Sequence, residues 1–188
     1  MSKFKILVLV GSTRRDSINR KLAQALGKLG GDRFALSQAR VDDLPLYNQD
    51  LEADLPASVA RFKAQIAAAD AVLFVTPEHS RSIPAALKNA LDWGARPWGK
   101  YSWTGKLAAV TGTSPGAIGT AIAQQHLKQI LAAQGVLVMG GEHYVAFRPD
   151  LLGADDTIAD EGTRKFLQGF VDQLAALLAR FSDQAIAA

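Results

Sequence analysis

The sequence predicts a three-layer α/β fold, a doubly wound parallel sheet of five strands in the flavodoxin-like order 2-1-3-4-5. Short apolar segments alternate with segments of helical periodicity along most of the chain. The segments 4–10 and 70–76 each contain an unbroken apolar run, residues 6–10 and 71–75, as in strands buried on both faces of a parallel sheet. Helices must then connect consecutive strands and cover both faces of the sheet.

The first half of the chain should contain strands at 4–10, 33–36 and 70–76. A helix is expected at 18–29, where apolar residues recur every three or four positions, with Ser17 as its N-cap. A second helix is expected at 53–69, with Pro56 in its first turn, where proline is tolerated.

The second half continues the alternation. Helices are expected at 84–95, 117–134 and 163–181, and strands at 106–111 and 135–139. Gly135 follows the middle helix, as glycine commonly does at helix C-termini. We therefore expect one α/β domain over residues 1–188, with 183–188 as a disordered tail.

Composition excludes several kinds of site. The chain has no cysteine, which removes disulfides, thiolate catalysis and cysteine-ligated metals, and its three histidines lie on separate segments, so no metal is expected. The net charge is +3 and the sequence has no dense block of basic residues, which argues against nucleic-acid binding. The apolar segment 6–10 is too short to span a membrane or to form a signal-peptide core, and a cytoplasmic location is expected.

Three polar loops should meet at one edge, because ligands of open parallel sheets bind beyond the carboxyl ends of the strands. The first, 11–19, has Gly11 for the turn, hydroxyls at 12, 13 and 17, the Asn19 amide and the Arg14 guanidinium. Together with free N–H groups at a helix start they predict a cradle for a terminal phosphate. The alternative is a helix cap with unrelated polar residues.

The second and third loops suit a flat ring. Two prolines stiffen loop 76–84, whose backbone could read a ring edge; the alternative is a rigid connector. Small residues in loop 111–119 allow close approach of the backbone. The run from Gly112 to Gly116 also matches the G-x-S-x-G of hydrolases, but Pro115 lacks the N–H that an oxyanion hole needs after the serine.

The segments GSTRRDSIN, TPEHSRSIP with LKNALDW, and TGTSPGAIG resemble the NADPH-dependent FMN reductase family. LPLYNQD, ARP and FLQGFVDQL extend the resemblance over most of the chain. It implies a flavodoxin-like fold, non-covalent FMN, NADPH or NADH as hydride donor, and a homodimer or homotetramer. The implied acceptors are small molecules: quinones, chromate, ferric complexes, azo compounds or free flavin.

The resemblance also implies roles for individual residues. FMN would be bound by Gly11, Ser12, Thr13, Arg14, Ser17, Ile18, Asn19, Pro77, Glu78, His79, Ser80, Arg81, Ser114, Pro115 and Gly116. Arg81 and Arg96 would meet the nucleotide phosphates or an anionic acceptor, and Glu78 and Arg96 are the catalytic candidates, although Arg96 could equally be a surface or subunit-contact residue. The family usually has Tyr-Asn where this chain has His79-Ser80, so an aromatic wall gives way to an imidazole.

A non-catalytic flavodoxin-like electron carrier is the alternative to an enzyme. Both would hold FMN in the same loops. Such carriers tend to be acidic, whereas this chain has a pI near 9.3. The basic charge therefore favours the oxidoreductase.

Overall fold

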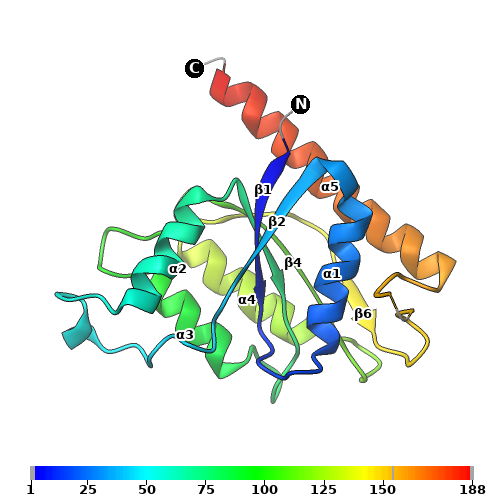
Figure 1. Cartoon of the computed structure of the whole chain (residues 1–188), viewed down its shortest axis with the longest axis horizontal. Coiled ribbons are helices and arrows are strands. Elements are labelled where there is room, and N and C mark those ends of the chain that lie inside the picture. Colours follow the sequence, from blue (N-terminus) through cyan, green and yellow to red (C-terminus); the bar gives the residue numbers. More distant parts are fainter. Residues whose placement is uncertain (1–2, 154, 187–188) are drawn as a thin grey trace.

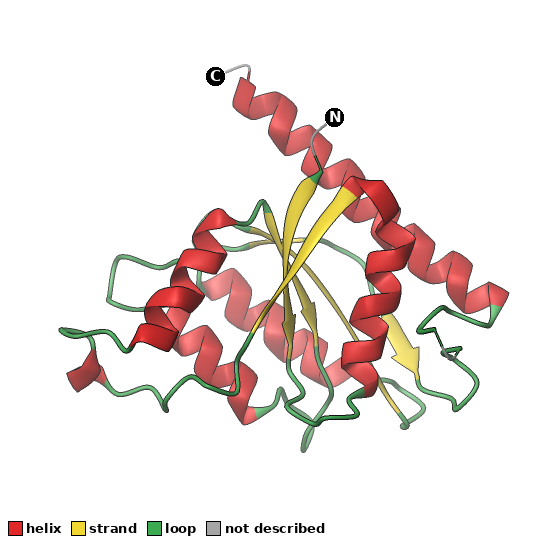
Figure 2. Cartoon of the chain, in the orientation of Figure 1, coloured by secondary structure: helices red, strands yellow, loops and turns green. Residues whose placement is uncertain are grey.

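The structure, a computed structural model, describes residues 3–153 and 155–186. Its sheet contains β1 (Phe4–Val10), β2 (Phe34–Ala39), β3 (Ala71–Val75), β4 (Leu107–Ser114) and β5 (Leu137–Val138) in the order β2-β1-β3-β4-β5. All pairings along this path are parallel, which Figure 2 shows as a twisted fan of strands. The predicted fold class and strand order are confirmed.

Helices cover both faces of the sheet (Figure 1). On one face α1 (Ile18–Gly30) and α5 (Glu161–Ile186) pack against side chains such as Ile6 and Val8. On the other face α2 (Ala57–Ala68), α3 (Ala85–Gly94) and α4 (Ala121–Ala133) pack against side chains such as Leu7 and Leu9. Because successive strand residues point to opposite faces, the continuous apolar run 6–10 supplies both cores.

The last strand position of the sheet is divided between two short strands. Besides β5, β6 (Tyr144–Ala146) also pairs with β4, and the register moves by two residues between the pairs Ala108–Val138 and Gly112–Tyr144. Gly141, with φ of 93°, lies in the interruption. The sequence predicted one strand at 135–139 and missed β6, since two- and three-residue strands show no periodicity.

Two expected helices begin later than predicted. The helix expected from 53 begins at Ala57 because Pro56 has the extended ψ of 140° and is the N-cap, not part of the first turn. Residues 49–51 form a separate 3₁₀ turn. The helix expected from 117 begins at Ala121, since Gly119 has a left-handed φ of 59° that no helix residue adopts.

Other boundaries differ at strand and chain ends. β2 and β4 run further toward the carboxyl edge than the predicted 33–36 and 106–111. α5 continues to Ile186, so residues 183–186 of the expected disordered tail are helical, while 187–188 lie outside the described residues. Within residues 3–153 and 155–186, none of the helices combines the length and apolar character that crossing a membrane requires.

Candidate functional site

The three predicted loops meet at the carboxyl edge of the sheet, where hydrogen bonds connect the ends of neighbouring strands. The Gly11 N–H donates to the Val75 carbonyl at 2.9 Å, and the Thr76 N–H donates to the Thr111 carbonyl at 3.0 Å. A Cβ on Gly112 would lie 2.0 Å from the Thr76 carbonyl oxygen, so only glycine permits this approach. The ends of β1, β3 and β4 therefore form one platform.

The first loop presents a row of free donors. Among the described residues, no protein oxygen accepts a hydrogen bond from the backbone N–H groups of residues 12–19. Ser17 is the predicted N-cap of α1, because its Oγ accepts from the Arg20 N–H at 3.2 Å. Arg14 is exposed beside these groups. Free N–H groups at a helix N-terminus are the usual setting for a bound phosphate.

Asn19 connects the first loop to the third. Its Nδ2 donates to the Thr113 carbonyl and its Oδ1 accepts from the Thr113 N–H, both at 2.9 Å. The residue is only 1% exposed. The Asn19 amide, expected in the cradle, therefore serves first to hold α1 against the end of β4. The Oγ1 of Thr113 itself is buried without a hydrogen-bond partner in the described part of the chain.

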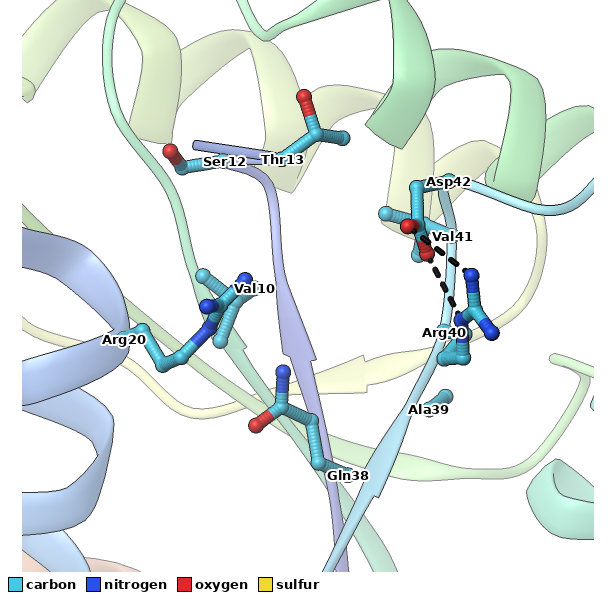
Figure 3. Close-up of a pocket in the computed structure, with 9 residues that line it drawn as sticks. All are labelled: Val10, Ser12, Thr13, Arg20, Gln38, Ala39, Arg40, Val41 and Asp42. Carbon is cyan, nitrogen blue, oxygen red and sulfur yellow. Dashed lines mark hydrogen bonds and ion pairs between the residues drawn. The ribbon is translucent and has the colours of Figure 1, made fainter. Parts of the chain in front are cut away.

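A cavity of about 130 Å³ borders the first loop, between α1 and the end of β2 (Figure 3). It is lined by Val10, Ser12, Thr13, Arg20, Gln38, Ala39, Arg40, Val41 and Asp42. Arg40 is paired with Asp42 at 3.1 Å, whereas the Nε of Arg20 is buried without a partner among the described residues. The cavity therefore retains the positive charge of Arg20 next to the cradle.

Sequence reasoning missed Arg20 and Gln38 as neighbours of the cradle. Arg20 lies one residue beyond the motif that ends at Asn19, and Gln38 lies on an edge strand expected to end at 36. Only the parallel pairing of Val8 with Gln38 brings the β2 residue beside the first loop. Had the strand been predicted to continue to Ala39, Gln38 would have been placed beside the first loop.

The second loop contains a tight reverse turn. His79 and Ser82 exchange two backbone hydrogen bonds of 2.9 Å, and the intervening Ser80 and Arg81 both have left-handed φ values, 49° and 61°. Two left-handed central residues are typical of a type I′ turn, which normally uses Asn or Gly there. Asn, which the resemblance gives for position 80, would suit this left-handed backbone better than Ser80 does.

The side chain of Glu78, in the second loop, bonds to the N-terminus of α4. Its carboxylate accepts from the backbone N–H groups of Ile122 and Ala123, at 3.0 and 3.1 Å, and from Arg81 at 2.9 Å. Burial by itself raises the pKa of Glu78, but the Ala123 N–H, Arg81 and the Ile122 N–H outweigh it and lower the pKa overall. The carboxylate is therefore charged at neutral pH, with both oxygens occupied.

The third loop leaves its small residues open. Ser114 ends β4 and its Oγ donates to the Gly119 carbonyl, so its proton faces the backbone and not a general base. Pro115 and Gly116 are exposed, and a Cβ on Gly116 would meet only the Ser114 Oγ, at 3.6 Å. The arrangement leaves room beside the backbone at Gly116 and does not form a nucleophile elbow.

Arg96 lies apart from the three loops. Its Nε bonds to Glu52 at 2.6 Å, and its guanidinium lies 5.3 Å from the centre of the Tyr47 ring. It follows α3, whose ten residues span about 15 Å. The structure therefore does not bring Arg96 together with Arg81, which precedes that helix.

The residues present fit a flavin mononucleotide. Free N–H groups, hydroxyls and the guanidiniums of Arg14 and Arg20 suit its phosphate, and the exposed backbone of the second and third loops suits its ring. Within residues 3–153 and 155–186, no three His, Asp or Glu side chains gather in a way that could hold a metal ion. The donor set therefore matches an anionic organic cofactor.

Comparison with known proteins agrees with this geometry. Residues 4–149 match the family described as NADPH-dependent FMN reductase. The chain is 49% identical over 173 residues to a 2-hydroxy-1,4-benzoquinone reductase of Burkholderia sp., covering 92% of this chain and 94% of that protein. It is 45% identical over 175 residues to a quinone reductase of Pseudomonas putida, with coverages of 92% and 94%.

A solved structure is also similar over nearly the whole chain. FerB, a flavoenzyme NAD(P)H:(acceptor) oxidoreductase from Paracoccus denitrificans, superposes with a TM-score of 0.91 at 47% identity, covering 94% of this chain and 98% of that one. The match over residues 4–149 includes all three loops, the turn at His79–Ser82 and the cavity beside Arg20. The chain belongs to the NADPH-dependent FMN reductase family, whose enzymes use both FMN and the nicotinamide cofactor, as the sequence predicts.

Proposed function

We propose that the protein is an FMN-dependent NAD(P)H oxidoreductase whose preferred acceptors are small quinones. The observation that carries the proposal is the row of free N–H groups at residues 12–19, next to Arg20 and within reach of two open loops. The quinone assignment is supported by the similarity to proteins named as quinone reductases. Chromate, ferric complexes, azo compounds and free flavin are further acceptors within the proposal.

Each loop has its own part in holding the cofactor. The phosphate is held by Ser12, Thr13, Arg14, Ser17 and the backbone of Gly11 through Asn19, which is the role that suits their free donors. Pro77–Arg81 and Ser114–Gly116 would border the ring. FMN, when bound, supplies the redox chemistry by taking a hydride and returning its electrons to an acceptor.

No side chain in this site needs to act as an acid or a base. Both oxygens of Glu78 accept hydrogen bonds, and Arg96 is paired with Glu52 at a distance from the loops. We therefore propose that the chain contributes binding and orientation. Arg81, which is 68% exposed, is the candidate to meet an anionic part of the nucleotide or acceptor. Arg96 would reach a site only across a contact between subunits of a homodimer or homotetramer.

Steady-state kinetics separates this proposal from the electron carrier. The purified protein, loaded with FMN, is mixed with NADPH or NADH and a benzoquinone, and nicotinamide oxidation is followed. A reductase turns over without any other protein. A carrier oxidises the nicotinamide only when a separate reductase is added, and that result would refute the proposal. The cytoplasmic location stays a prediction that cell fractionation would check.

A further inference from the structure

We infer that Glu78 is a positioning residue: it fastens the loop after β3 to the N-terminus of α4, and so fixes the two loops that border the proposed ring site. The inference rests on the proposed function, because it assigns Glu78 a part in holding FMN. It removes Glu78 from the catalytic candidates. Glu78 would affect FMN binding indirectly, through the backbone of Ile122 and Ala123.

The contacts of Glu78 bridge two distant segments. Oε2 accepts from the Ile122 and Ala123 N–H groups at 3.0 and 3.1 Å, across 44 and 45 positions of sequence. Oε1 accepts from Arg81 Nη1 at 2.9 Å. The Glu78 side chain is only 7% exposed, so water competes little for these bonds. Three charge-assisted bonds therefore anchor a single carboxylate.

The helix end that Glu78 occupies has no local cap. Thr120 is the residue before α4, and its side chain makes no capping hydrogen bond. The first N–H groups of a helix have no partner within the helix, and the helix dipole places partial positive charge there. The carboxylate of Glu78 satisfies two of these groups and opposes that charge. Glu78, from another loop, thus caps α4 in place of Thr120.

The same carboxylate steadies a strained turn. Arg81, which Glu78 binds, has φ of 61°, and its neighbour Ser80 has φ of 49°. Left-handed conformations are unfavourable for residues other than glycine and persist where surrounding contacts hold them. Glu78 holds one end of this turn and α4 together. The expected ring edge at His79–Arg81 and the expected ring face at Ser114–Gly116 are thereby kept in fixed relation.

The test compares Glu78→Gln with Asp160→Asn in the full chain. Gln has the same shape as Glu but carries no charge, and when its oxygen faces the Ile122 and Ala123 N–H groups, its amide nitrogen cannot accept from Arg81. Asp160 is the matched control, because it also caps a helix, accepting from the Thr163 N–H at 2.7 Å at the start of α5. Two quantities are measured: amide hydrogen exchange at Ile122 and Ala123, and the dissociation constant of FMN.

We expect exchange at Ile122 and Ala123 to accelerate in Glu78→Gln and FMN binding to weaken by about tenfold or more. Asp160→Asn should leave FMN binding within about twofold of the unchanged chain, since surface caps act locally. Should Glu78→Gln not fold, Glu78→Asp keeps the charge but is one methylene short, and the same weakening is expected.

Faster exchange with unchanged FMN affinity would show that Glu78 supports the helix alone and would overturn the inference. Equal weakening in Asp160→Asn would overturn it too, because the effect would then be one of general stability. If the unchanged chain itself binds no FMN, the proposed function fails. The exchange measurement still reports whether Glu78 caps α4.

Discussion

Asn19 and Thr113 are 94 positions apart in sequence, yet the Asn19 side chain exchanges two hydrogen bonds of 2.9 Å with the Thr113 backbone. The pair is buried, so neither bond is shared with water. It ties the start of α1, where the phosphate is expected, to the end of β4, where the ring is expected. The Asn19 amide therefore links the two halves of the site directly.

Replacing Asn19 with Ala should leave the buried N–H and carbonyl of Thr113 without hydrogen-bond partners. A buried unsatisfied polar group costs about 1–3 kcal/mol, so we expect the free energy of unfolding to fall by about that amount or more. FMN affinity should fall as well. Urea unfolding and FMN titration of the variant measure the two effects. Asn48→Ala is the control, because Asn48 caps an exposed 3₁₀ turn in the loop after β2; similar losses in both variants would contradict the role of Asn19.

Two glycines near the third loop should respond differently to Ala. A Cβ on Gly112 would lie 2.0 Å from a backbone oxygen and 2.6 Å from Thr120 Oγ1, so we expect Gly112→Ala to lose more than about 3 kcal/mol of stability or not to fold. Gly116→Ala should fold normally, because its Cβ meets ordinary contacts. Thermal unfolding compares them. A Gly112→Ala variant as stable as the parent chain would contradict the close approach of β3 and β4.

Ser80 is expected to limit stability because of its left-handed backbone. Ser80→Gly should raise the melting temperature, since glycine relieves a cost of about 1–2 kcal/mol and loses somewhat less to chain entropy. Ser80→Val should lower it, because a β-branched residue is strongly disfavoured there. Differential scanning calorimetry of both variants tests the turn geometry. The reverse order of melting temperatures would show that the turn differs from the one described.

His143 should make stability depend on pH. Burial, with a smaller contribution from the charge of Lys128, lowers the pKa of His143. The unfolded chain therefore takes up its proton first: stability is full above the ordinary histidine pKa of about 6.5 and falls as the pH drops through that value toward the native pKa. His143→Phe should flatten the profile between pH 7 and 5, since the ring packs 4.6 Å from Phe170. An unchanged profile in the variant would assign the pH dependence to other groups.

The sequence was sufficient for the fold because the decisive pattern is local. A run such as 6–10, apolar at every position, requires a core on each face of the sheet, and the structure has both cores. The meeting of three loops followed from the parallel arrangement alone. Ser17 could be identified as a cap from its position directly before an apolar-periodic segment.

What the sequence did not predict depends on contacts between distant segments. Nothing near Glu78 indicates that its carboxylate caps a helix 44 positions later, and nothing near Asn19 points to Thr113. Pro56 is compatible with the first turn of a helix and with an N-cap, and the backbone ψ decides between them. The strand β6 owes its existence to pairing with β4 and has only three residues of its own.

Residues 12–19 are proposed to bind a phosphate, and titration of the FMN-free protein with FMN and with riboflavin tests this role directly. The two ligands share the ring and ribityl chain and differ only in the phosphate. Several charge-assisted bonds to that group predict that FMN binds at least about 100-fold more tightly than riboflavin, and that Arg14→Ala narrows the gap. Equal affinity for the two ligands, or no binding of either, would contradict the account.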